Sequence, residues 1–82
     1  MKANEVIAGL NVLQPYYKDP GGYNIGAEHD QIYAYATDFP LTKPDVQLLC
    51  TLGWFQEDVQ VADDKDFGPD DYDPEEGWST YV

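Results

Sequence analysis

The segment from Thr42 to Gly53 constrains the fold most, because so many apolar side chains in one short run belong in a core. Thr42-Lys43-Pro44-Asp45 has the form of a capping box, with proline in the first turn, where its missing N–H costs little. Gly53 suits a left-handed C-terminal cap that would fold Trp54 back on the last turn. We therefore expect a helix over about residues 43 to 52 as the central core element, with these apolar residues: Val46, Leu48, Leu49, Cys50 and Leu52.

A second helix is expected near the N-terminus, over about residues 5 to 14. Asn4 can cap it, Pro15 ends it, and one apolar stripe runs along it. Gly9 costs about 1 kcal/mol against alanine inside a helix, so either another backbone passes close by or the helix is weak. The stripe consists of Val6, Ile7, Leu10 and Leu13.

Alternating residues between 23 and 37 predict a β-hairpin that reverses at Glu28-His29-Asp30. Tyr23, Ile25 and Ala27 alternate with polar or small residues in the first strand. The second strand, Gln31–Thr37, has a small apolar face and a tyrosine face. If a helix packs on the alanine side, Tyr33 and Tyr35 lie on the opposite side.

The C-terminal third predicts a long acidic loop and one further strand. Val59 and Val61 fit a short strand, residues 63 to 77 fit a charged loop, and residues 77 to 82 fit a terminal strand. The expected fold class is α+β, a single domain over residues 1–82, with two helices on an antiparallel sheet of three to four strands in the order α-β-β-α-(β)-β.

Size and composition support folding in spite of the charge. Eighty-two residues lie near the lower limit for a self-sufficient core, but two tryptophans, seven tyrosines and three phenylalanines can bury much area. The single cysteine forms no intramolecular disulfide.

No stretch approaches the roughly 20 apolar residues of a membrane span, and no signal peptide is evident. We expect a cytoplasmic protein (host-cell cytoplasm if it is encoded by a phage) that anionic membranes repel.

Negative charge is concentrated in the last third of the chain. Residues 1 to 56 hold six acids and three lysines, a net charge of −3, whereas residues 57 to 82 hold ten acids and one lysine, a net charge of −9. A surface that serves solubility alone would tend to mix and spread its charges. A one-sided run that also contains Phe67, Tyr72 and Trp78 favours a docking face for a basic partner, with charge speeding encounter and rings anchoring the complex.

The sequence lacks the sets of residues that common catalytic and metal-binding sites require. One histidine (His29) and one cysteine (Cys50) do not make a zinc site, and Ser79 has no evident base. An EF-hand loop starting at Asp63 would place Lys65 and Pro74 at ligand positions. We therefore expect no enzyme activity and no cofactor. An irregular cation site in the acidic loop stays open as an alternative.

Direct binding of nucleic acid is disfavoured, because such affinity comes largely from lysine and arginine, and the chain has four lysines and no arginine. Acids mixed with an aromatic ring form three runs near the C-terminus: Glu57-Asp58, Asp63-Asp64-Lys65-Asp66 and Asp70-Asp71-Tyr72-Asp73-Pro74-Glu75-Glu76. In these runs, and in its size and charge, the chain resembles small phage- or plasmid-encoded inhibitors that imitate DNA, of the anti-CRISPR and anti-restriction type. The resemblance implies that carboxylates take phosphate positions in a nucleic-acid-binding groove.

The leading hypothesis is an inhibitor or modulator that binds a basic nucleic-acid-handling protein. An alternative is an accessory assembly module of a phage or bacterium that binds through its tyrosine face, and a homodimer is plausible because so small a core gains from a partner. A third is that the acids serve solubility alone. The predicted partner-binding residues are Glu57, Asp58, Asp63, Asp64, Asp66, Asp70, Asp71, Tyr72, Asp73, Glu75, Glu76, Tyr33 and Tyr35.

Overall fold

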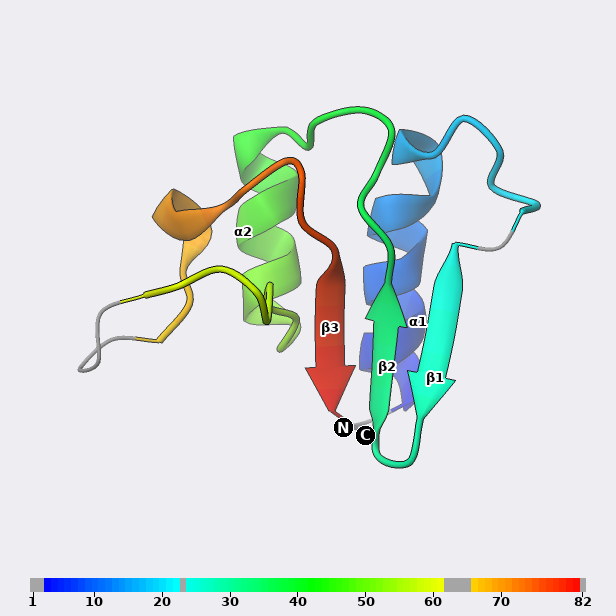
Figure 1. The fold of residues 1–82 in the computed structure, drawn as a ribbon, viewed down its shortest axis with the longest axis horizontal. Helices are drawn as coiled ribbons and strands as arrows, with labels where there is room; N and C mark the ends of the chain where they lie inside the picture. Colours follow the sequence, from blue (N-terminus) through cyan, green and yellow to red (C-terminus); the bar gives the residue numbers. More distant parts are fainter. Residues whose placement is uncertain (1–2, 23, 62–65, 82) are drawn as a thin grey trace.

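Two helices lie behind a three-stranded antiparallel sheet, so one face of the sheet is left uncovered (Figure 1). The computed structural model describes residues 3–22, 24–61 and 66–81. The predicted α+β class is confirmed, in one domain with the order α-β-β-α-β. The elements are α1 (Ala3–Leu13), the 3₁₀ turn η1 (Gln14–Tyr16), β1 (Ile25–Glu28), β2 (Gln31–Ala34), α2 (Lys43–Thr51), the 3₁₀ turn η2 (Pro69–Asp71) and β3 (Trp78–Tyr81).

Helix α2 forms where the sequence predicts it, and its C-terminus has the expected glycine cap. Gly53 has a φ of 89°. Its N–H donates to the Cys50 carbonyl at 3.1 Å, and the N–H of Trp54 donates to the Leu49 carbonyl at 2.9 Å. This pair of hydrogen bonds is a Schellman motif, which satisfies two carbonyls of the last turn. Trp54 folds back as expected and is only 1% exposed.

The predicted capping box at the start of α2 does not form. The Thr42 side chain makes no capping hydrogen bond to the helix backbone and instead lies near the Tyr16 hydroxyl. That hydroxyl donates to the Asp45 carboxylate, the acid that the capping box would have used. A tertiary contact with η1 therefore replaces the local cap that the sequence suggests.

Helix α1 is close to its predicted range, and Gly9 has a packing role. Val6 and Leu13 are buried, whereas Ile7 is 58% exposed and lies off the stripe. A Cβ atom on Gly9 would lie 2.8 Å from Cδ1 of Trp54 and closer still to the indole nitrogen. The close approach that we expected at Gly9 thus comes from an aromatic side chain and not from another backbone.

The sheet is a hairpin extended by the C-terminal strand. Residues of β1 and β2 pair from Ile25–Ala34 to Glu28–Gln31, so His29 and Asp30 form the turn. Strand β2 then pairs with β3. The second strand ends earlier than predicted, at Ala34, and Tyr23 lies outside the described residues.

Strand β3 has a further partner on its other edge. Val59 and Val61 are not in a strand; instead, Phe55 and Ser79 exchange two backbone hydrogen bonds, of 2.9 and 2.7 Å. Strand β3 is an edge strand of the sheet, whose order is β1-β2-β3, and the isolated bridge to Phe55 pairs part of its outer edge.

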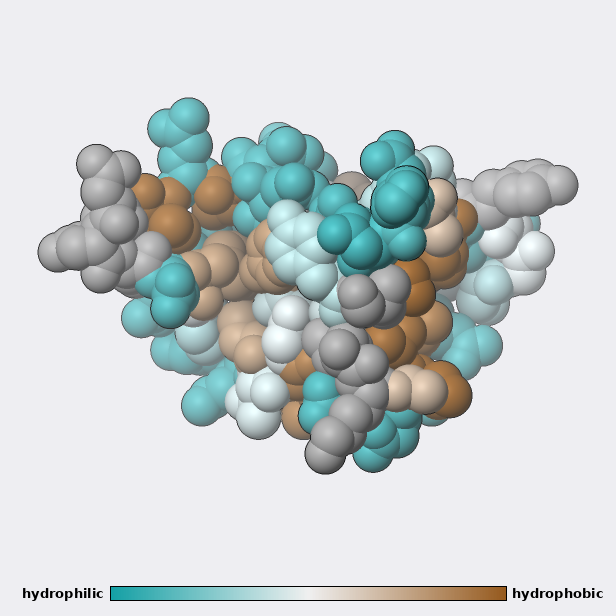
Figure 2. Space-filling model, turned by 90° about the horizontal axis from the view of Figure 1, so that it is seen from below, coloured by the Kyte–Doolittle hydropathy of each residue, from teal (hydrophilic) through white to brown (hydrophobic). Residues whose placement is uncertain are grey.

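The core fills the space between the sheet and the helices. Trp54, Trp78, Leu49 and Leu13 are each at most 1% exposed. Seen from below, apolar residues lie in a band between hydrophilic residues above and below (Figure 2). The acidic segment contributes to this core, since Phe67 makes an edge contact with Trp78 and Tyr72 stacks on it, with ring centroids 5.6 and 5.9 Å away.

We predict that Gly9→Ala destabilises the protein by about 1–3 kcal/mol, as is typical of overpacking in a core, although alanine is the better helix former. Urea unfolding followed by tryptophan fluorescence measures the change. Gly21→Ala is the matched control, because its Cβ would meet only Asp19, at 3.6 Å. A Gly9→Ala protein as stable as the control would contradict the packing of Trp54 on α1.

Candidate partner-binding groove

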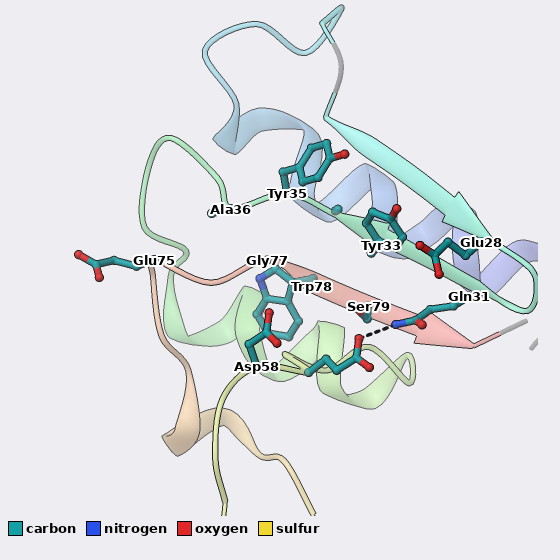
Figure 3. A pocket seen from close by; sticks show the side chains of 12 residues that line it. Glu28, Gln31, Tyr33, Tyr35, Ala36, Asp58, Glu75, Gly77, Trp78 and Ser79 are labelled. Carbon is teal, nitrogen blue, oxygen red and sulfur yellow. Dashed lines mark hydrogen bonds between the residues drawn. The ribbon is translucent and has the colours of Figure 1, made fainter.

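The uncovered face of the sheet carries a groove of about 500 Å³. Tyr33 of β2 and Ser79 of β3 are directly opposite each other, and both lie on this face because their neighbours Ala34 and Trp78 are buried toward the helices. Tyr33 lies opposite the buried Ala34, as predicted, and Tyr35, just beyond the end of β2, also lines the groove, although Ala36 of the predicted alanine face lines it too. The lining consists of Glu28, Gln31, Tyr33, Ala34, Tyr35, Ala36, Glu57, Asp58, Glu75, Gly77, Trp78 and Ser79 (Figure 3).

Four carboxylates line the groove, and no basic side chain among the described residues joins them. Glu28 comes from the end of β1, Glu57 and Asp58 from the turn after Phe55, and Glu75 from the loop before β3. All four are exposed. Segments far apart in the sequence therefore bring negative charge to one surface, which makes the groove attractive to cations.

Glu57 is held in the groove by a hydrogen bond. The Gln31 side-chain amide donates to Oε2 of Glu57 at 2.8 Å (Figure 3). Gln31 is itself the β2 residue that pairs with Glu28 and with Tyr81. The sheet register thus determines where this carboxylate lies, and its second oxygen stays available to a ligand.

The position of Tyr33 depends on a glycine in the neighbouring strand. Gly26 pairs with Tyr33, and a Cβ atom on Gly26 would lie 2.6 Å from Cζ of the tyrosine. The ring therefore lies over the glycine backbone, where a side chain would block it. Tyr35 meets this ring at an angle of 64°, with centroids 6.0 Å apart.

Tyr35 is anchored from the helix side of the molecule. The hydroxyl of Tyr17, which follows η1, donates to the Tyr35 carbonyl at 2.6 Å. The N–H of Tyr35 donates to the Asn24 carbonyl at 2.9 Å. Its backbone is thus fixed on both sides, while its ring is 52% exposed.

A buried glutamine ties the acidic loop to the sheet. Gln56 is 1% exposed, and its amide nitrogen donates to the carbonyls of Asp73 and Glu76 at 2.7 and 3.1 Å. Its amide oxygen accepts from the Asp73 N–H at 2.8 Å. These three bonds hold residues 73–76 beside Phe55 and so place Glu75 at the edge of the groove.

The predicted site residues separate into two groups. Tyr33, Tyr35, Glu57, Asp58 and Glu75 line the groove, whereas the other described ones do not: Asp66, Asp70, Asp71, Tyr72, Asp73 and Glu76. Asp63 and Asp64 lie outside the described residues.

Several of the second group have structural roles. Asp71 accepts from the Gly68 N–H at 2.9 Å and caps η2, and Asp73 accepts from the Glu75 N–H at 2.9 Å. The Tyr72 hydroxyl accepts from the Leu41 N–H at 2.9 Å. Asp70 approaches Lys43 at 4.0 Å in an exposed pair, which contributes little to stability.

The sequence interpretation missed Glu28, Gln31 and Ser79 as groove residues. Part of this could have been found from the sequence. Once the hairpin register is known, the alternation of side chains places Gly26 and Glu28 on the same face of the sheet as Tyr33. The contribution of Ser79 depends on the long-range pairing of β3, which local patterns do not reveal.

The residues considered for other chemistry are placed as follows. Cys50 is half-buried, and burial, followed by the nearby charge of Asp71, raises the pKa of its thiol, which disfavours the reactive thiolate. His29 is exposed in the hairpin turn.

Within the described ranges, no three or more histidine, cysteine or carboxylate side chains are grouped to hold a metal ion. Neither described helix has the length and apolar character that a membrane crossing requires.

Comparison with protein-family models, with curated proteins and with solved structures finds no match to this chain. Its function is therefore inferred from its own geometry and charge.

The anchor at Tyr17 predicts a pH dependence of stability. Burial, and then the charge of Asp38, raise the pKa of Tyr17 from 10.0 to about 12. Because the folded state holds this proton more tightly than the unfolded state, the contribution is complete below pH 10 and is lost as the pH rises toward 12. Urea unfolding over this interval should show a fall in stability that Tyr17→Phe lacks. An equal fall in both proteins would contradict the buried state of this hydroxyl.

Proposed function

We propose that the protein is a non-enzymatic inhibitor or modulator that binds the basic nucleic-acid-binding surface of another protein. The observation that carries this proposal is the groove on the uncovered sheet face, where four carboxylates surround two tyrosines and no described basic residue intervenes. Acidic groups there would take the places of phosphates, and the rings would add contact area that phosphates lack.

Charge favours this class of partner over the alternatives. A chain with a net charge of −12 repels nucleic acids and anionic lipid surfaces, and attracts proteins whose surfaces are basic. Inhibition then needs only occupation of the partner's groove, without a chemical step. Since such partners act in the cytoplasm, we propose that this protein acts there too.

The groove and the remaining acids have different roles in this proposal. Glu57 and Asp58 would form contacts in the complex, because they line the groove beside the tyrosines. Asp66 and Asp70 are exposed but do not line it, so they would act mainly at long range, by speeding the encounter. Affinity should therefore depend much more on the first pair than on the second.

The second candidate, an accessory assembly module, uses the same surface. It is favoured by the exposure of the Tyr35 ring, which is 52%, because tyrosine is enriched in protein interfaces. It differs in that the tyrosines and not the carboxylates would carry the affinity. A homodimer through this face would bring the four carboxylates of one copy near those of the other, which disfavours that arrangement.

The test compares two double variants that remove the same charge. The protein is first used to recover its partner from a host lysate at low salt. We predict that Glu57→Gln with Asp58→Asn lowers affinity for that partner by about tenfold or more, as losses of interfacial charge contacts do. Asp66→Asn with Asp70→Asn should change it by no more than about twofold. Binding by the unmodified protein should weaken as salt rises and should compete with nucleic acid.

Three results would contradict the proposal: recovery of no nucleic-acid-binding protein, equal effects of the two double variants, or simultaneous binding of nucleic acid and inhibitor to the partner. Loss of binding with Tyr33→Ala and Tyr35→Ala, together with unchanged affinity in the Glu57 and Asp58 variant, would favour the assembly module instead.

A further inference from the structure

We propose that the groove holds the guanidinium group of an arginine side chain from the basic partner, stacked on the outward face of Tyr33. This inference rests on the proposed function, because it names the chemical group that the acidic groove recognises. It is carried by the orientation of two rings, by a hydroxyl at the floor of the groove, and by the carboxylates beside them.

The first step concerns the face that Tyr33 presents. One side of its ring lies against the backbone of Gly26 in β1, so the other side faces away from the sheet. Tyr35 makes an edge contact with it at 64°, and both residues line the groove (Figure 3). Two rings at this angle form a corner that a flat cation can enter, with attraction to the ring face.

The second step concerns Ser79. This residue lies across from Tyr33 in the sheet register, is only 5% exposed and lines the groove. Its hydroxyl lies on the groove side of β3, next to Tyr33 of β2. A ligand N–H that reaches the groove floor would donate a hydrogen bond to the Ser79 oxygen.

The third step concerns charge. The Glu57 carboxylate is oriented by Gln31, and Asp58 and Glu28 line the same groove. A carboxylate beside an aromatic face suits a cation that stacks on the ring and donates hydrogen bonds to the carboxylate at the same time. Such a donor can bind Ser79 and a carboxylate together only if it carries several N–H groups.

These demands favour arginine over lysine. A guanidinium group is planar, carries five N–H donors in a fixed arrangement and is weakly hydrated, so it stacks on a ring while its edges donate. An ammonium group is a compact, strongly hydrated point charge. The carboxylates attract it, but it has no flat surface to stack in the corner between the two rings. The groove should therefore distinguish two cations of equal charge.

The experiment uses two capped synthetic peptides, one of alternating glycine and arginine and one of alternating glycine and lysine, titrated into the isotope-labelled protein and followed by NMR. We expect the arginine peptide to bind about fivefold more tightly, with resonances of Tyr33, Tyr35 and Ser79 shifting most. Tyr33→Leu should reduce arginine affinity to the level of lysine and leave lysine affinity unchanged.

Two further variants make the result independent of folding defects. Tyr81→Leu is the control, because Tyr81 is a strand tyrosine of β3 that packs on Phe55, outside the groove; it should leave the preference intact. Ser79→Ala, a smaller change, should lower arginine affinity about threefold through the lost hydrogen bond.

Failure of this inference is distinguishable from failure of the proposed function. If both peptides bind equally, and both lose affinity with Glu57→Gln and Asp58→Asn, the acidic groove stands but the arginine site is refuted. If the affinity of neither peptide depends on Glu57 and Asp58, both the arginine site and the proposed function are refuted. Equal effects of Tyr33→Leu and Tyr81→Leu would also overturn the inference.

Discussion

The pairing of β3 along both of its edges is the constraint on which the rest of the structure depends. This strand is the last of the three in the sequence, and it pairs with β2 on one edge and, through an isolated bridge, with Phe55 on the other. The first pairing brings Ser79 beside Tyr33, and the second brings the Glu57–Asp58 turn to the same face. Without both, the tyrosines and the carboxylates would not share a surface. The groove is therefore a consequence of long-range pairing and not of any local acidic motif.

The acidic segment is partly structural. Its rings, Phe67 and Tyr72, pack on Trp78, and the buried amide of Gln56 holds its later part beside the sheet. Aromatic burial and a satisfied polar network thus offset the repulsion among carboxylates that would otherwise extend this stretch. These contacts with the core offset the free-energy cost of ordering so charged a segment. Glu75 is therefore held at a defined place.

The elements predicted from sequence were those with local signals. Helix α2 and the cap at Gly53 follow from composition and backbone preference, and the hairpin follows from alternation about His29 and Asp30. The capping box at Thr42 failed because the Tyr16 hydroxyl, distant in sequence, binds Asp45. Ten acids in twenty residues predicted an acidic surface, but no local pattern distinguishes Asp71, which caps a turn, from Asp58, which lines the groove. That distinction depends on strand register and on the contacts of Gln56.

The most direct test of the central claim is carbodiimide labelling of carboxylates, read by mass spectrometry, in the free protein and in its complex with the recovered partner. The account predicts that Glu28, Glu57, Asp58 and Glu75 lose reactivity in the complex, while the exposed Asp66 and Asp70 keep theirs. Protection of Asp66 and Asp70, with the four groove carboxylates still reactive, would show that the partner binds elsewhere and would contradict the account.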